Sequence, residues 1–107
     1  MKYEVFITQD AIEDLYEIYR YIEKQGYKRR AKNLIEQIRK LCYSLTEFPY
    51  RGHPPPELKR IGVVDYLELH YKTYRIVYKI TENKVYIHCV LDGRRYLQDL
   101  LEKRLLR

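Results

Sequence analysis

Apolar residues recur along the chain with two different periods, and these periods predict its elements. The opening run Tyr3-Glu4-Val5-Phe6-Ile7 is β-prone and predicts a short strand. Thr8 is a suitable N-cap for a first helix, because its hydroxyl can accept a hydrogen bond from the first turn. That helix carries one apolar stripe at helical spacing and ends at Gly26; the stripe consists of Ala11, Ile12, Leu15, Ile18, Tyr19 and Ile22.

A second apolar stripe predicts a second helix, which Pro49 closes. Its members are Ala31, Leu34, Ile35, Ile38, Leu41, Cys42 and Leu45. The connection between the two helices is short, so they should form an antiparallel hairpin. Residues 48–62 contain all four prolines of the chain and predict an irregular, non-helical stretch.

Three strands are predicted after this stretch, at residues 63–71, 74–80 and 85–91. The links between them are short, which favours an antiparallel meander. Alternation predicts one face that covers the helices, formed by Leu67, Leu69, Tyr74, Ile76, Tyr78, Ile80, Val85, Ile87, Cys89 and Leu91. The opposite face is expected to be open and to carry Glu68, His70, Arg75, Lys79 and His88. Residues 96–106 read as a short terminal helix.

This element order predicts an α+β fold. An N-terminal strand and an antiparallel helical hairpin should pack on a twisted, mainly antiparallel β-sheet, followed by a short C-terminal helix. A length of 107 residues is typical of one domain, so residues 1–107 are expected to form a single domain.

The composition narrows the class of protein. Apolar residues make up 46% and charged residues 34% of the chain, which is typical of a soluble globular protein. Cys42 and Cys89 lie in apolar stretches without metal-ligand spacing, and the histidines do not cluster, so no metal and no cofactor is expected. No signal peptide or membrane-spanning run is visible, which predicts a cytoplasmic protein without a membrane partner.

The charge is uneven along the chain. The formal net charge is +6, from 21 basic and 15 acidic residues. Residues 1–50 hold nine basic and eight acidic residues (9 − 8 = +1), and residues 51–107 hold twelve and seven (12 − 7 = +5). A basic half suggests a polyanionic partner such as nucleic acid, and solubility is the alternative explanation.

Five short motifs, in this order along the chain, resemble the RelE/ParE toxins of type II toxin–antitoxin systems. They are Ala11-x-x-Asp14-Leu15-x-x-Ile18-x-x-Tyr21-Ile22, Phe48-Pro49-x-x-Gly52, Tyr74-Arg75-Ile76-Val77-Tyr78, Tyr86-Ile87-His88-Cys89-Val90-Leu91 and Asp92-Gly93-Arg94-Arg95. The resemblance covers nearly the whole chain and includes the element order. It implies a toxin that is held in a hetero-oligomer by a cognate antitoxin, part of which folds on binding.

The resemblance implies two different activities. RelE-like members cleave mRNA in the A site of the ribosome, whereas ParE-like members are described as poisoning DNA gyrase by binding, without hydrolysis. The sequence leads us to expect a ribosome-dependent endoribonuclease, with gyrase inhibition as the alternative and a purely binding or structural member as a third hypothesis.

Cleavage by attack of the 2′-hydroxyl needs a base, an acid and cations for the phosphate. The resemblance gives Arg75 the role of stabilising the transition state, and Glu57 stands near the position of a base in a related branch. RelE uses lysines on the strand before the tyrosine–arginine motif, but this chain has Tyr66 and Glu68 at those positions, so the resemblance does not imply a lysine mechanism here. His88 and Arg95 complete the predicted catalytic set. The alternatives are an Arg75–Glu68 ion pair, a solvated Glu57 and a structural His88.

A second group of residues is predicted to bind nucleic acid. Its members are His70, Lys79, Arg94, Arg95 and Tyr96. Arginine can bind phosphate with two parallel hydrogen bonds, and a tyrosine can stack on a base. Arg94 and Arg95 could instead hold the antitoxin, and Tyr96 could cover the edge of the sheet.

Overall fold

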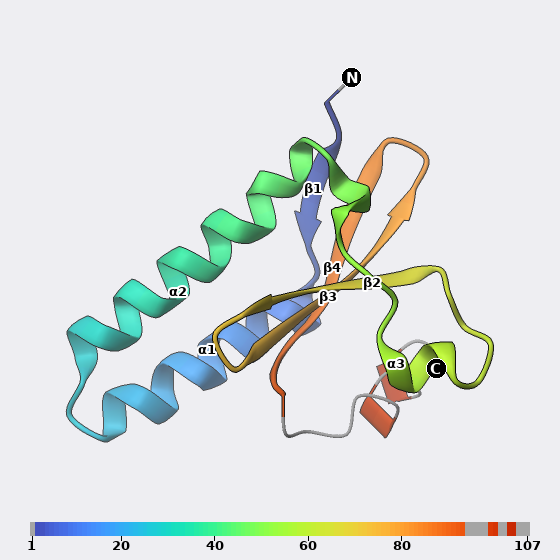
Figure 1. Ribbon diagram of the computed structural model, residues 1–107. Helices are drawn as coiled ribbons and strands as arrows, with labels where there is room; N and C mark the ends of the chain where they lie inside the picture. Colours follow the sequence, from blue (N-terminus) through green and yellow to red (C-terminus); the bar gives the residue numbers. More distant parts are fainter. Residues whose placement is uncertain (1, 94–98, 101–102, 105–107) are drawn as a thin grey trace.

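The computed structural model describes residues 2–93, 99–100 and 103–104, and it consists of a helical hairpin on one face of a four-stranded sheet (Figure 1). The hairpin is formed by α1 (Gln9–Lys24) and α2 (Lys28–Tyr43). The strands are β1 (Glu4–Ile7), β2 (Tyr66–Tyr71), β3 (Tyr74–Thr81) and β4 (Lys84–Asp92), in the spatial order β1-β4-β3-β2. The predicted α+β fold is confirmed.

The two helices form where the apolar stripes predict them, except that α2 ends at Tyr43 and the last residue of its predicted stripe, Leu45, lies in a 3-10 turn. Thr8 caps α1, its Oγ1 accepting a hydrogen bond of 3.2 Å from the Ala11 backbone N–H. Gly26 lies in the turn between the helices with φ +91°, a conformation that favours glycine. None of the described helices has the length and apolar character needed to cross a membrane.

The helical stripes bury themselves against the sheet and form the main core. Its fully or nearly fully buried members are Ala11, Leu15, Ile38, Cys42, Leu45, Ile76, Tyr78, Val85, Ile87 and Val90. These residues come from α1, α2, the 3-10 turn that follows α2 (Leu45) and the two central strands. Removing their apolar surface from water is the main favourable contribution to folding.

The sheet is mainly antiparallel, as predicted. β3 pairs with β2 and with β4 in the antiparallel sense, and β1 alone pairs parallel to β4. The parallel pairing arises because α1 and α2 carry the chain across the face of the sheet before β2 begins. It places the N-terminal strand at the outer edge of β4.

The predicted alternation along β4 is wrong beyond Ile87. Val77 is paired with Cys89 and Tyr78 with Ile87, so His88 is an extra residue in β4 and forms a bulge. One extra residue moves all later side chains to the opposite face. Cys89 and Leu91 therefore lie on the face away from the helices, whereas the expectation put them in the core under the hairpin.

The face opposite the hairpin is not open, which corrects a second expectation. It carries a smaller core that contains Leu58, Val77, Cys89 and Leu91, packed against Val63, Tyr66 and Leu100. Leu58 comes from the short helix α3 (Pro56–Lys59), which lies close to the helical residues near the C-terminus (Figure 1). The predicted C-terminal helix lies partly outside the described residues, and those at 99–100 and 103–104 are helical.

The irregular stretch is anchored by one buried hydroxyl. It contains the 3-10 turn η2 (Pro49–Arg51) and the helix α3, so the expectation that residues 48–62 are non-helical is wrong in part; a further 3-10 turn, η1 (Ser44–Thr46), precedes it. Tyr78 Oη donates a 2.7 Å hydrogen bond to the Pro49 carbonyl and accepts one of 3.1 Å from Gly52 N–H. A Cβ at Gly52 would lie 2.4 Å from this oxygen, so the approach requires glycine. The anchor brings the following residue, His53, to the edge of β2.

A buried ion pair between Asp14 and Arg104 binds the backbone of β4 at the edge of the sheet where β1 ends. β1 ends beside Ile87, and none of the described strands pairs with the outer edge of β4 at residues 88–90. Asp14 of α1 accepts a 2.9 Å hydrogen bond from Val90 N–H, and Arg104 donates one of 3.0 Å to the His88 carbonyl. Asp14 and Arg104 also pair with each other, at 2.6 Å and 2.8 Å. Together they replace the missing strand at the bulge.

We expect Asp14→Ala to destabilise the fold by about 3–5 kcal/mol, because it leaves a buried arginine and a backbone N–H without their acceptor. The matched control is Asp65→Ala. Asp65 forms an ion pair with Lys79, but its side chain is 58% exposed, so its loss should cost less than about 1 kcal/mol. Urea unfolding of the two variants measures the difference, and equal losses would contradict the role given to Asp14.

Candidate functional site

Arg75 lies in the middle of an ion-pair cluster on the face opposite the hairpin. Its Nε and Nη2 donate to the two oxygens of Glu68 at 2.8 Å and 3.0 Å. Its Nη1 and Nη2 donate to the two oxygens of Glu57 at 2.5 Å and 2.8 Å. The side chain is only 11% exposed. The guanidinium is therefore held by a carboxylate on each of two sides, and the alternative of an Arg75–Glu68 pair is the one that the structure contains.

Strand pairing and the proline run bring these three residues together. His70 is the direct partner of Arg75 in the β2–β3 register, and Glu68 lies two residues earlier on the same face. Glu57 is in the first turn of α3, which starts at Pro56 after two further prolines. Proline is favoured at the first position of a helix and cannot extend one backwards. Because α3 begins at Pro56, the Glu57 carboxylate lies against Arg75.

The cluster keeps all three groups charged. The hydrogen bonds from Arg75 lower the pKa of Glu57 below its ordinary value, against a smaller opposing effect of burial. Burial alone would raise the pKa of Glu68, but the hydrogen bonds from Arg75 and His70 outweigh it and lower that pKa. The two carboxylates in turn raise the pKa of Arg75. Two carboxylates and one guanidinium leave a net formal charge of −1.

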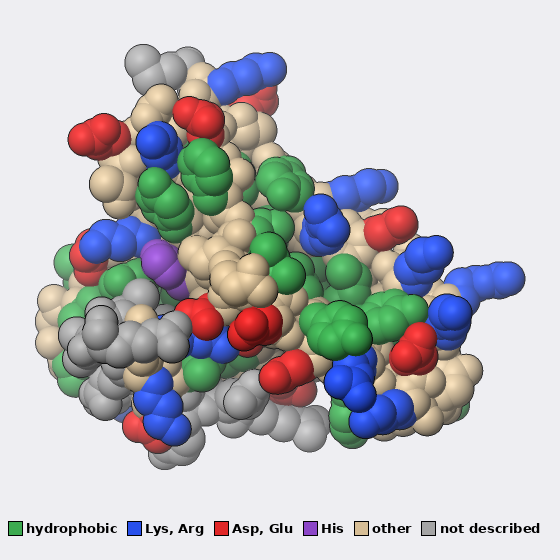
Figure 2. Space-filling model, turned by 180° about the vertical axis from the view of Figure 1, so that it is seen from behind, with side chains coloured by type: hydrophobic (Ala, Val, Ile, Leu, Met, Phe, Trp, Pro, Cys, Tyr) green, Lys and Arg blue, Asp and Glu red, His purple; other side chains and the backbone are tan. Residues whose placement is uncertain are grey.

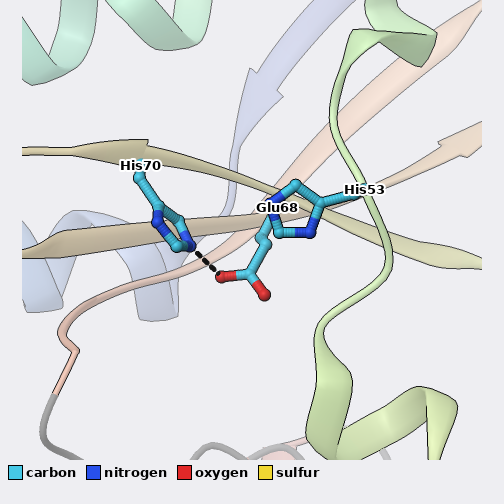
Figure 3. Close-up of side chains that lie close together, drawn as sticks. All are labelled: His53, Glu68 and His70. Atoms are coloured by element: carbon cyan, nitrogen blue, oxygen red, sulfur yellow. Dashed lines mark hydrogen bonds and ion pairs between the residues drawn. The ribbon is translucent and has the colours of Figure 1, made fainter.

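Two histidines extend the cluster toward solvent (Figure 3). His70 Nε2 lies 2.6 Å from Glu68 Oε1, and the rings of His53 and His70 are 5.5 Å apart. One potential ligand atom from each of His53, Glu68 and His70 lies within 4.8 Å of the other two. The histidines do not cluster in the sequence. The fold brings His53 and His70 together because the segment after Gly52 pairs with β2.

A hollow of about 310 Å³ opens beside this cluster, and we call it the Arg75 hollow. Its lining residues are His53, Pro56, Glu57, Glu68, His70, Lys72, Thr73, Tyr74, Arg75 and Gly93. Gly93 N–H donates a 2.7 Å hydrogen bond to the Thr73 carbonyl, which holds the end of β4 against the β2–β3 turn. Of the predicted residues, Glu57, His70 and Arg75 meet here.

His88 and Lys79 lie in a different environment. The His88 ring packs edge-to-face on Tyr66 at 5.7 Å, and it does not line the Arg75 hollow. Burial, aided by the positive charges of Lys79 and Arg104, lowers the pKa of His88. Lys79 Nζ lies 3.2 Å from Asp65 Oδ2 and 5.4 Å from the centre of the Tyr66 ring. The structure therefore does not bring His88 together with Arg75 and Glu57, which the predicted catalytic set requires.

The remaining predicted residues are Arg94, Arg95 and Tyr96. They lie outside the residues that the structure describes. Their assignment to catalysis and nucleic-acid binding stays a prediction.

Comparison with known proteins now identifies the family. The sequence model of the ParE toxins of type II toxin–antitoxin systems, parDE, matches residues 5–97. The chain belongs to this family. It is the toxin of a type II toxin–antitoxin system of the ParE/RelE group.

Two solved structures share the fold of this toxin. The toxin–antitoxin complex RelBE2 from Mycobacterium tuberculosis has a chain of 20% identity and TM-score 0.64, with 86% of this chain and 92% of that chain covered. The chromosomal ParDE system from P. aeruginosa has one of 15% identity and TM-score 0.71, with 85% and 96% covered. A comparison with curated sequences gave no match.

The sequence did not point to His53 as part of the toxin's site. Glu68 and His70 share a face by alternation, so their proximity could be expected from the strand alone. His53 lies in a proline-rich stretch without periodicity, and its backbone pairing with Glu68 is a tertiary contact. No local pattern signals such a bridge.

The lowered pKa of Glu57 predicts a pH-dependent stability. A carboxylate with a depressed pKa stabilises the folded state above its unfolded pKa of about 4.3, and the effect is lost as pH falls through the folded pKa. Glu57→Gln should therefore cost about 1–2 kcal/mol at pH 7 and progressively less below about pH 4. Urea unfolding between pH 7 and pH 3 tests this.

The control for that series is Glu36→Gln, the same substitution at an exposed position of α2. It should leave the free energy of unfolding nearly unchanged at both ends of the range. A Glu57→Gln variant that parallels the parent protein at every pH would show that the Arg75 pairing does not stabilise the fold.

Proposed function

We propose that this toxin stops growth by binding DNA gyrase in the cytoplasm, without cleaving RNA, and that a cognate antitoxin neutralises it. The proposal reverses the preference that the sequence alone suggested. The observation that carries it is the state of Arg75, whose guanidinium is engaged by Glu57 and Glu68. The likeness to ParE, whose members are described as gyrase poisons, supports the target.

An RNA-cleaving site needs a cation that is available to the phosphate in the transition state. Arg75 donates four hydrogen bonds to two carboxylates and keeps one N–H, on Nη1, so a phosphate could form two parallel hydrogen bonds with it only by displacing a carboxylate. A phosphate entering beside both carboxylates would meet a cluster of net negative charge. Like charges a few ångströms apart in a partly buried site repel strongly. These costs argue against phosphoryl chemistry at Arg75.

The surface best suited to a binding partner lies at the other end of the molecule. Figure 2 shows basic side chains gathered where the two long helices are joined. We call this the basic hairpin end; its residues are Lys28, Arg29, Arg30 and Lys32. Within the described chain, none of the four forms an ion pair with an acidic residue, although Arg30 packs over the Tyr27 ring. α2 has no acidic residue in its first turn, so positive charge accumulates there against the helix dipole.

Ribosome-dependent mRNA cleavage is the second candidate function. One specific observation favours it, because Glu57 and His70 share the Arg75 hollow and could serve as base and acid. This function requires the ribosome to separate Arg75 from Glu57. Glu57 would then be free to act as the base, and Arg75 to bind the phosphate. The two candidates therefore differ in what Glu57 does.

The antitoxin is proposed from the neighbouring structures. Both are described as toxin–antitoxin systems, and one of them explicitly as a complex. A segment of the antitoxin that folds on the toxin surface fits the hetero-oligomer expected from the sequence.

The deciding test assays the same purified toxin in two ways, for inhibition of supercoiling by gyrase and for cleavage of mRNA on ribosomes. We expect inhibition of supercoiling and intact mRNA. Replacing Lys28, Arg29 and Arg30 together by alanine should weaken inhibition on the order of tenfold or more, since charge steering speeds association by at least that factor. Glu57→Gln should leave inhibition unchanged, because it lies outside the proposed binding surface.

The opposite pattern would overturn the proposal. It consists of undisturbed supercoiling together with ribosome-dependent cleavage that Glu57→Gln abolishes. The triple alanine variant changes only exposed side chains, so circular dichroism should confirm that it folds like the parent toxin.

A further inference from the structure

His53, Glu68 and His70 are brought to one face of the molecule by backbone hydrogen bonds. Glu68 N–H donates to the His53 carbonyl at 2.8 Å, and His53 N–H donates to the Glu68 carbonyl at 3.3 Å. Residues paired in this way in an antiparallel bridge project their side chains to the same face. His70 follows Glu68 by two residues in β2 and shares that face as well. Three metal-ligating side chains therefore converge by strand geometry.

The distances between the potential ligand atoms of His53, Glu68 and His70 suit a small cation after modest rotations of the two histidine side chains. A zinc ion binds imidazole nitrogen and carboxylate oxygen at about 2.0–2.1 Å, which puts neighbouring tetrahedral ligand atoms about 3.3 Å apart. His70 Nε2 and Glu68 Oε1 are 2.6 Å apart, and all three ligand atoms lie within 4.8 Å of one another. Glu68 is fully buried, whereas His53 and His70 are exposed and can turn toward it (Figure 3).

The surrounding groups orient two of the three ligands. His53 Nδ1 lies 3.4 Å from the Pro54 carbonyl, an oxygen that can only accept, so the tautomer with its proton on Nδ1 suits this contact and leaves Nε2 for a metal. Glu68 Oε2 is held by Arg75 Nη2, and Oε1 by Arg75 Nε. A metal between His70 and Oε1 replaces only the hydrogen bond from His70, so the pairing with Arg75 persists. Hydrogen bonds of this kind to a ligating carboxylate are usual around metal sites.

We propose that His53, Glu68 and His70 bind one divalent transition-metal ion, with Zn²⁺ as the physiological candidate. Two imidazoles and one carboxylate favour zinc and its neighbours over magnesium and calcium, which prefer oxygen ligands. The formal charge of −1 on Glu57, Glu68 and Arg75 attracts a dication. The remaining coordination positions face solvent and are available to water. The site is independent of whether the toxin acts on gyrase or on the ribosome.

The experiment is a calorimetric titration of the full-length, untagged toxin with ZnCl₂. We expect one ion per chain. His53→Gln and His70→Gln should each weaken binding roughly tenfold or more, since loss of even an outer-shell partner costs 10- to 100-fold. The third histidine of the chain, His88, is the matched control: it lies against Tyr66 outside this cluster, and His88→Gln should bind Zn²⁺ like the parent toxin.

A second measurement separates binding from folding. Zn²⁺ should raise the melting temperature of the parent toxin and of His88→Gln, EDTA should reverse this, and the double variant His53→Gln/His70→Gln should show no rise. The double variant changes two exposed side chains, so circular dichroism should show a normal fold. The proposal is overturned if the parent toxin binds no Zn²⁺ or if the double variant binds it unchanged. An equal loss in all three single variants would also overturn it.

Discussion

The pairing of Arg75 with two carboxylates is the interaction on which one whole face of this toxin depends. A guanidinium that is taken out of water needs acceptors on both of its edges, because an unpaired buried charge is far more costly than a paired one. Glu68 supplies the acceptors from β2, and Glu57 supplies them from α3. Arg75 therefore ties three segments together, and the packing of Leu58 over Val77 completes the smaller core beneath them.

The same pairing constrains what this face can do. The group that a phosphate would need is already neutralised, and Glu57 and Glu68 together outweigh its charge. The groups at this face that can still bind a ligand are the Glu68 carboxylate and the two exposed imidazoles beside it. This arrangement suits a cation better than an anion. A local group of basic side chains lies elsewhere, at the basic hairpin end, where none of the four forms an ion pair with an acidic residue of the described chain.

The opposite edge of the sheet shows how a bulge can be stabilised by side chains. His88 is the extra residue of β4 just beyond the point where β1 ends, so no described strand pairs with the outward-facing backbone groups of His88 and Val90. Asp14 and Arg104 bind the free N–H and carbonyl groups and pair with each other. A residue of the first helix and one near the C-terminus thus meet over one irregularity of the central strand.

The sequence by itself determined the two long helices, the strands, their order and most of the main core, because helix and strand periodicity are local properties of the chain; it did not indicate α3. It also determined that Cys42 and Cys89 are buried, and burial raises the pKa of both thiols to about 12. Only the tertiary structure decided which face Cys89 and Leu91 occupy, since a single bulged residue reverses the alternation. It also decided that Arg75 is neutralised and that His53 joins Glu68 and His70. Those contacts join residues 7 to 18 positions apart, through pairing that no local pattern encodes.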